Sequence, residues 1–171
     1  MKIVITGADG YIGNHITNEL KDKNFNVLNV VKRDSFSRSD NFIIKRISRH
    51  TDWSNIFKQK DILIHCAGIS SNKNIKTKDD IQNLYEINTY CLENLIDEAI
   101  KYGIKKIIFF STFKVINKIN YKKNKNLFPF SKFDYYTHSK LLAEKILIKK
   151  AEQYKHKIII LRIPAVYGEN M

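Results

Sequence analysis

Short apolar runs alternate with longer stretches of helical periodicity along the whole chain, a pattern typical of strand–helix–strand units and a parallel sheet. The first helical stretch, for example, places Ile12, Ile16 and Leu20 at the spacing of one helix face. The expected strands span 2–6, 26–31, 42–47, 61–65, 105–110 and 157–163, and the expected helices span 11–21, 53–58, 79–102 and 135–154. The pattern predicts an α/β protein, with a doubly wound, six-stranded parallel sheet in a single domain over residues 1–171.

Composition sets further limits on the kind of protein. The 171 residues are 43% hydrophobic and 27% charged, as in an ordinary globular domain, and no apolar run is long enough to cross a bilayer. Met1 and Lys2 lead directly into the first expected strand, so we expect no secretory signal. Cys66 and Cys91 match no metal or redox spacing, which favours two buried thiols in a reducing compartment. We therefore expect a cytoplasmic protein with no metal site and no membrane partner.

The net charge of +13 raises the question of a nucleic-acid partner. Of the 30 basic residues only five are arginines, and the lysines are scattered along the whole chain. Proteins that read bases usually cluster their arginines, or interleave aromatic residues with charge on one face. The basic composition therefore predicts solvated lysines, and we expect no specific nucleic-acid binding.

A glycine-rich turn follows the first expected strand directly, with Gly7, Gly10 and Gly13 at three-residue spacing. Glycine at these places lets a strand turn sharply into a helix and lets the backbone approach a pyrophosphate. The phosphates would face the free N–H groups at the start of the helix, at Tyr11 and Ile12, where the helix dipole favours negative charge. The turn predicts a dinucleotide-binding site.

The end of the second expected strand bears on which dinucleotide is bound. In dinucleotide-binding sheets this place, about 20 residues after the glycine turn, usually holds an acidic residue that binds the hydroxyls of the adenosine ribose. Here it holds Lys32 and Arg33, which would attract a ribose 2′-phosphate, and Asp34 comes too late. The pair therefore favours NADP over NAD. The alternative is that both are solvated charges at a strand end of a lysine-rich protein.

A tyrosine and a lysine in the last expected helix suggest proton-transfer chemistry. Tyr136 and Lys140 are four residues apart, so they share one helix face. An ammonium close to a phenol would lower the phenol pKa toward neutral pH, and the tyrosine could then exchange a proton with a substrate hydroxyl or carbonyl. Tyr135 is a weaker candidate because its partner one turn on, Ser139, carries no charge. We expect His138 to be a surface residue.

Several of these residues, in one order and at consistent intervals, resemble a known family. They are the Gly7, Gly10 and Gly13 turn, the string His65-Cys66-Ala67-Gly68, Asn88, Ser111-Thr112, and the Tyr136 and Lys140 pair. Together they are similar to the extended short-chain dehydrogenases/reductases, in the NAD-dependent epimerase/dehydratase branch that acts on nucleotide sugars. The strings 51–53, 110–115 and 161–168 are closer still to a subgroup of UDP-glucose 4-epimerase-like and UDP-4-keto-sugar 4-reductase proteins. The resemblance implies a Rossmann fold over essentially the whole chain.

The resemblance implies a catalytic set of three residues. Thr112 stands where the family places its catalytic Ser or Thr, and it would hydrogen-bond the sugar oxygen that Tyr136 protonates or deprotonates. Lys140 would also hold the hydroxyls of the nicotinamide ribose. Hydride transfer would take place at C4 of the sugar.

The resemblance also implies further cofactor contacts. Asp52 and Trp53 match a pair that lies against adenine, and Ala67-Gly68 matches the turn beside the adenosine ribose and phosphates. Asn88 matches a buried helix asparagine that orders the site, and Pro164 matches backbone that packs on the nicotinamide. The alternatives are structural: Asp52 as a helix cap, and Asn88 as a hydrogen-bonded core residue.

The family comparison narrows the expected reaction. The 4,6-dehydratases need an acidic pair directly after the catalytic Thr, whereas Phe113 and Lys114 follow Thr112, so we do not expect dehydration. C4 epimerisation and 4-keto reduction of a nucleotide sugar, UDP-linked in this subgroup, remain. Members of the family are nearly twice as long, so the C-terminal substrate domain would be largely missing from these residues. A dinucleotide-binding module without turnover is the alternative, and a homodimer through the 79–102 and 135–154 helices remains open.

Overall fold

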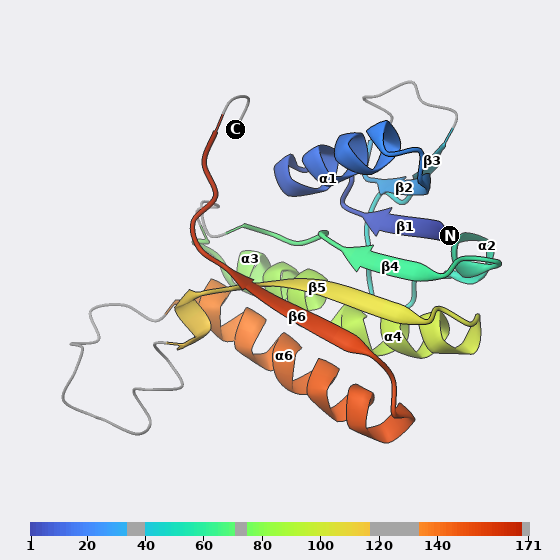
Figure 1. The fold of residues 1–171 in the computed structure, drawn as a ribbon. Coiled ribbons are helices and arrows are strands. Elements are labelled where there is room, and N and C mark those ends of the chain that lie inside the picture. Colours follow the sequence, from blue (N-terminus) through green and yellow to red (C-terminus); the bar gives the residue numbers. More distant parts are fainter. Residues whose placement is uncertain (34–39, 71–74, 117–133, 169–171) are drawn as a thin grey trace.

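The computed structural model describes residues 1–33, 40–70, 75–116 and 134–168, and it is built around a six-stranded parallel sheet (Figure 1). The strands are β1 (Lys2–Thr6), β2 (Asn26–Val31), β3 (Asn41–Ile43), β4 (Ile62–His65), β5 (Lys106–Thr112) and β6 (Ile158–Ile163). Their order across the sheet is β3-β2-β1-β4-β5-β6, with every neighbouring pair parallel. The strand order reverses between β1 and β4, which confirms the doubly wound sheet expected from the sequence.

Helices cover both faces of this sheet (Figure 1). They are α1 (Tyr11–Asp22), α2 (Ser54–Phe57), α3 (Lys78–Tyr85), the π-helical turn η1 (Glu86–Tyr90), α4 (Cys91–Lys101) and α6 (Tyr135–Tyr154). Helix α1 packs on one face, and α3, α4 and α6 lie on the other. The helix expected at 79–102 is therefore the succession of α3, η1 and α4, with a wider turn in its middle. Turns of this kind re-aim the side chains around them and are frequent at functional sites.

The core has two layers, one on each side of the sheet. Along β1, Val4 points toward α4 and α6, and its neighbours Ile3 and Ile5 point toward α1. All three are buried, with at most 2% of their surface exposed. A strand buried on both faces reads as a continuous apolar run rather than an alternating one, and this explains why the sequence marks β1 so clearly.

Two strands, β3 and β5, end at residues other than those expected. The third strand was expected to reach residue 47, but β3 ends at Ile43, and the Ile44 N–H to Val31 carbonyl bond of 2.9 Å lies just beyond it. The next residues leave the sheet so that Ile47 can turn into the core, where it is 8% exposed. At the other end of the sheet, β5 extends two residues further than expected, because Thr112 pairs with Ile163 of β6.

Within the described ranges, no helix combines the length and the apolar character that a membrane crossing requires.

Candidate functional site

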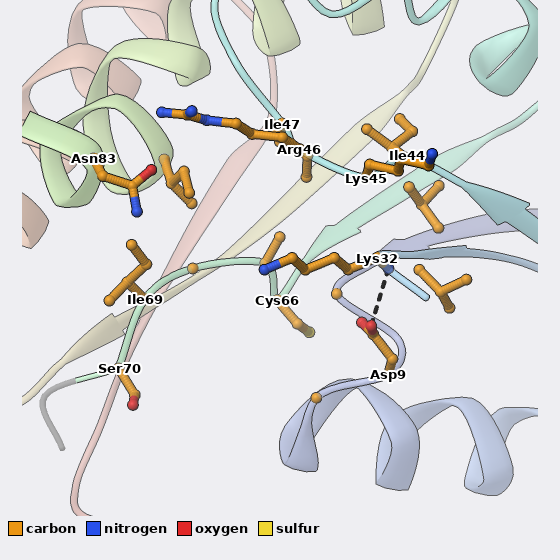
Figure 2. Close-up of a pocket in the computed structure, with 17 residues that line it drawn as sticks. Asp9, Lys32, Ile44, Lys45, Arg46, Ile47, Cys66, Ile69, Ser70 and Asn83 are labelled. Atoms are coloured by element: carbon orange, nitrogen blue, oxygen red, sulfur yellow. Dashed lines mark hydrogen bonds between the residues drawn. The ribbon is translucent and has the colours of Figure 1, made fainter. Parts of the chain in front are cut away.

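A cavity of about 590 Å³ opens at the carboxyl ends of β1, β2 and β4 (Figure 2). Parallel α/β sheets bind their ligands at this edge, close to the point where the strand order reverses. The lining residues are Gly7, Asp9, Gly10, Val30, Val31, Lys32, Ile44, Lys45, Arg46, Ile47, Cys66, Ala67, Gly68, Ile69, Ser70, Asn83 and Ile87. The cavity therefore lies where the glycine turn and the second strand predicted a dinucleotide.

The glycine turn forms one wall of the cavity and leaves no room for side chains. Gly7 has a φ of 69°, and a Cβ atom there would lie 2.6 Å from the backbone of Ala67. A Cβ atom on Gly13 would lie 2.1 Å from the Gly7 carbonyl oxygen. Gly10 precedes α1 without a side-chain cap, so the first N–H groups of the helix have no side-chain acceptor from it. Such a turn suits the close approach of an anionic pyrophosphate.

Asn88 holds the opposite wall in place. Its Oδ1 accepts a 2.7 Å hydrogen bond from the Ile69 N–H, and its Nδ2 donates to the Ile69 carbonyl at 3.0 Å. The same Nδ2 donates to Ser139 Oγ of α6 at 3.2 Å. Asn88 is only 1% exposed and does not line the cavity, so its amide acts by ordering the loop after β4. The η1 turn is the element that carries it.

The lysine of the expected catalytic pair is bound to the protein backbone. The Lys140 ammonium donates a 2.9 Å hydrogen bond to the Phe110 carbonyl and lies 4.6 Å from the centre of the Phe109 ring. The side chain is 7% exposed, and burial lowers the Lys140 pKa to about 8. At neutral pH the ammonium form still predominates.

The tyrosine of the pair differs from expectation in the direction of its pKa. Burial, and then the negative charge of Asp134, raise the Tyr136 pKa above its usual value of 10. The sequence predicted a lowered value through Lys140, and that prediction was wrong for this structure because the Lys140 ammonium is directed at the Phe110 carbonyl. Thr112 ends β5, is 9% exposed, and accepts a long 3.4 Å hydrogen bond from the Lys114 N–H through its hydroxyl oxygen.

A buried ionic cluster, which the sequence reasoning did not identify, joins the three elements of this region. Glu144 of α6 is 2% exposed and accepts a 2.6 Å hydrogen bond from Ser111 Oγ of β5. Arg162 of β6 donates a bidentate pair of hydrogen bonds to the same carboxylate, from Nη2 to Oε2 at 2.7 Å and from Nε to Oε1 at 3.0 Å. A signal existed in the sequence, since Glu144 follows Lys140 by one helical turn. The cluster fixes the ends of β5 and β6 relative to the helix that carries Tyr136 and Lys140.

The expected adenine pair lies elsewhere. Trp53 is fully buried in the core and stacks on Phe57 with ring centres 5.2 Å apart, so its indole is not available to a base. Asp52 is exposed, and its carboxylate accepts a 2.9 Å hydrogen bond from the Ser54 N–H at the start of α2, which lowers its pKa. Neither residue lines the cavity, and Arg46 and Ile47 do instead. Asp52 precedes Trp53, which is the N-cap residue of α2, so neither alternative for Asp52 is confirmed. The adenine prediction for the Trp53 side chain was wrong because that side chain is buried in the core.

The structure divides the remaining predicted residues into two groups. Those that line the cavity are Gly7, Gly10, Lys32, Ala67 and Gly68. Those that do not are Tyr11, Ile12, Gly13, Arg33, Asn88, Thr112, Tyr136, Lys140 and Pro164. Pro164 begins the segment after β6, which reaches α1, since a Cβ atom on Gly168 would lie 2.4 Å from the Tyr11 hydroxyl.

Five polar residues that line the cavity were not predicted from the sequence: Asp9, Lys45, Arg46, Ser70 and Asn83. Lys45 and Arg46 were hidden inside an expected strand, and Asn83 inside an expected helix. The available signal for the first two was the rule that residues just beyond a strand end gather at the carboxyl edge of a parallel sheet.

Comparison with known proteins gives a consistent picture. The sequence model of the NAD dependent epimerase/dehydratase family matches residues 3–171. A UDP-glucose 4-epimerase of Vibrio cholerae is 28% identical, with 97% of this chain aligned to 52% of that protein. The chain therefore spans about half the length of that relative.

Solved structures share the fold. The UDP-glucose 4-epimerase of Thermotoga maritima, solved with UDP-glucose, superposes with a TM-score of 0.78 at 25% identity, over 98% of this chain and 57% of that one. The UDP-glucuronic acid 4-epimerase of Bacillus cereus, in complex with NAD, gives a TM-score of 0.75 at 24% identity, with the same coverage of 98% and 57%.

Proposed function

Because this chain belongs to the NAD-dependent epimerase/dehydratase family, we propose that it is the dinucleotide-binding domain, over residues 1–171, of an enzyme that acts on a nucleotide sugar. The reaction proposed is hydride transfer at C4 of the sugar, as epimerisation or as reduction of a 4-keto sugar. The observation that carries the proposal is the cavity at the carboxyl ends of β1, β2 and β4, with the tight glycine turn as one wall. A UDP-linked substrate is supported by the names of the relatives.

The residues present fit a nicotinamide dinucleotide. Gly7, Gly10 and the first N–H groups of α1, at Tyr11 and Ile12, would hold the pyrophosphate, with Gly13 allowing the turn. The turn of Ala67 and Gly68 would contact the adenosine ribose and phosphates. At the other end of the dinucleotide, Lys140 would hold the nicotinamide ribose and the Pro164 backbone would pack on the nicotinamide ring. The bound cofactor supplies the hydride acceptor or donor.

The protein's own part in the reaction is proton transfer. The raised Tyr136 pKa keeps the phenol protonated at neutral pH, so Tyr136 is in the form that donates a proton to a carbonyl oxygen. The Thr112 hydroxyl would donate a hydrogen bond to the same oxygen and stabilise the negative charge that develops on it. In the opposite direction, an approach of the Lys140 ammonium toward the phenol would stabilise the phenolate that accepts the proton.

Two observations about the cofactor point in opposite directions, one to NAD and the other to NADP. The Bacillus cereus relative is in complex with NAD, whereas Lys32 stands where an acidic residue would bind the ribose hydroxyls of NAD. We therefore propose NADP or NAD as cofactor, with Lys32 favouring NADP.

The first test is thermal unfolding of the chain with and without millimolar NADPH and NADH. A ligand present at about 100 times its dissociation constant adds about 2.7 kcal/mol and raises the unfolding midpoint by several degrees. A clear shift with either cofactor supports the proposal. A cooperative transition that neither cofactor moves would overturn it.

The second test concerns turnover. In a full-length version of the protein, Tyr136→Phe removes the proton donor, so we expect turnover of UDP-sugars to be lost while cofactor affinity stays nearly unchanged. Full activity in this variant would refute the catalytic assignment.

The alternative function is a dinucleotide-binding module without turnover. It is supported by the lining of the cavity, which includes none of Thr112, Tyr136 and Lys140. It predicts a cofactor-induced shift in unfolding together with no absorbance change for the unmodified chain with any UDP-sugar.

A further inference from the structure

Ser139 lies in α6 between Tyr136 and Lys140 and is fully buried. Its Oγ donates a 2.7 Å hydrogen bond to the Tyr136 carbonyl and accepts a 3.2 Å hydrogen bond from Asn88 Nδ2. A serine hydroxyl carries one hydrogen, so its only donor is used on the backbone of Tyr136. Ser139 takes no part in the cofactor contacts or the proton transfer proposed above.

The contact with Asn88 links Ser139 to the cavity. Ile69 lines the cavity, and its backbone N–H and carbonyl both bond the Asn88 amide. Only the amide oxygen can accept from the Ile69 N–H, so Nδ2 faces the Ile69 carbonyl and the Ser139 hydroxyl. A continuous path of buried hydrogen bonds therefore runs from the loop after β4 to the backbone of Tyr136.

Tyr136 stands in the part of α6 that the helix itself holds least firmly. It is the second residue of that helix, and first-turn residues have few intrahelical hydrogen bonds, so helix ends fray. The N-cap Asp134 supports this turn through a 3.1 Å hydrogen bond from the Thr137 N–H to its carboxylate. The Ser139 hydroxyl supports the same turn at the Tyr136 carbonyl and connects it to a different element, η1.

A helical serine that bonds a carbonyl of its own helix is common, and by itself shows only that a buried hydroxyl has a partner. Ser139 differs because its second contact comes from another element and leads to a cavity-lining loop. The element is the π-helical turn η1, whose wider winding places the Asn88 amide and the Thr89 hydroxyl on the same serine. Turns of this kind are frequent at functional sites.

We infer that Ser139 is a positioning residue for the proposed reaction: its hydroxyl fixes the place of Tyr136 relative to the cavity loop at Ile69. The inference rests on the proposed function and adds to it a residue that touches neither cofactor nor substrate. Ser139→Ala would break the path between Asn88 and the Tyr136 carbonyl. The two Asn88 bonds to Ile69 would remain, so the loop should keep its place and the cofactor its affinity.

Thr89 offers a matched control for a merely structural role. Its Oγ1 donates a 3.0 Å hydrogen bond to the Ser139 carbonyl, and its side chain is as well buried as that of Ser139. Thr89→Val and Ser139→Ala each remove one buried hydroxyl between η1 and α6, but only the second interrupts the path to Tyr136. Ser139→Cys, whose thiol is a weaker donor and acceptor, should lie between Ser139→Ala and the wild type.

The chain itself gives a readout that needs no turnover. Its tyrosines are labelled with ¹³C, the Tyr136 signal is identified by its loss in Tyr136→Phe, and the pH titration of that signal is followed by NMR. Burial and Asp134 raise the Tyr136 pKa above 10, so we expect a tyrosine freed toward water in Ser139→Ala to titrate closer to 10. Thr89→Val should titrate like the wild type, and circular dichroism checks that each variant is folded.

Turnover in a full-length version of the protein gives the second readout. Ser139→Ala should lower kcat about tenfold and leave KM and the NADH and NADPH dissociation constants within about twofold, because positioning acts on the proton transfer and not on binding. Thr89→Val should leave kcat within about twofold.

The outcomes separate this inference from the proposed function. A Tyr136 pKa and a kcat that Ser139→Ala leaves unchanged, or that Thr89→Val changes equally, overturn the inference and leave the proposed function standing. If Ser139→Ala does not fold, Ser139→Cys decides by the same two readouts. A folded wild-type chain that binds neither NADH nor NADPH overturns both.

Discussion

The predicted site residues have different surroundings in the two halves of the sheet. At the β1–β2 side, glycines and strand-end residues from three segments surround a cavity of about 590 Å³. At the β5–β6 side, the Lys140 ammonium bonds the Phe110 carbonyl, and the Thr112 hydroxyl oxygen accepts a hydrogen bond from the Lys114 N–H. Among the described residues, the predicted catalytic residues Thr112, Tyr136 and Lys140 do not line this cavity.

The side chains of β1 and β6 also differ in how far neighbouring residues bury them. On the face that α1 covers, Ile3 and Ile5 of β1 are at most 2% exposed. On the same face at the β6 side, Leu161 is 39% exposed and its register partner Phe110 is only partly buried. The described residues thus cover the sheet more completely at β1, beside the cavity, than at β6.

The largest expected effect compares these two positions directly. Ile5→Ala removes a fully buried side chain and should lower the free energy of unfolding by about 2–5 kcal/mol. Leu161→Ala removes a side chain already 39% exposed and should cost about 1 kcal/mol or less. Urea unfolding of both variants gives the two values, and equal costs would show that the β6 side is as well covered as the β1 side.

The glycine turn provides the next test. Gly13→Ala places a methyl group 2.1 Å from the Gly7 carbonyl oxygen, and the required shift should cost about 3 kcal/mol and weaken dinucleotide binding. In Gly10→Ala the methyl group lies 3.2 Å from the same oxygen, and the φ of −85° is allowed, so the cost should stay below about 1 kcal/mol. Thermal unfolding of both variants measures this, and similar midpoints would contradict the close turn.

The buried ionic cluster tests what holds the β5–β6 side together. Glu144→Ala removes the acceptor of Ser111 and the partner of Arg162. Because the Arg162 side chain is 36% exposed and can reach water, we expect a loss of about 2 kcal/mol rather than the larger cost of a fully buried pair. Glu98→Ala is the control, because it leaves the Lys101 side chain, which is 62% exposed, in contact with water, and it should cost much less. Equal losses in chemical unfolding would argue against a structural role for the cluster.

The smallest expected effect depends on pH and reports on the burial of Lys140. Its pKa is lowered to about 8, so between that pH and the usual lysine value of 10.5 the unfolded chain binds a proton that the folded chain does not. The free energy of unfolding therefore rises with pH across this window. The Cys66 and Cys91 thiols, with pKa values raised to about 12, act in the opposite direction above about pH 9.

A variant isolates this contribution. The free energy of unfolding of the wild type minus that of Lys140→Met should rise by about 1 kcal/mol between about pH 7 and pH 9, because the two thiols are common to both proteins. A difference that stays constant over this range in urea unfolding would show that Lys140 is solvated.

The fold was predictable in most of its elements because buried parallel strands and their covering helices leave strong local patterns. β1, β2 and α6 have the bounds that periodicity gave, and the other elements differ by a few residues. β3 was the least accurate, since the apolar residues after Ile43 suggested strand continuation. Ile47 is apolar because it enters the core from a loop, and periodicity alone cannot separate these two cases.

The sequence by itself determined the glycine turn, the alternation of strands and helices, and the shared helix face of Tyr136 and Lys140, because each depends on residues close together in the chain. Only the tertiary structure decided that Arg46 rather than Arg33 lines the cavity and that Trp53 belongs to the core. It also decided that the Lys140 ammonium bonds a strand carbonyl and that Glu144 joins β5 to β6. These relations connect residues far apart in sequence, and they follow from which elements pack together rather than from any local pattern.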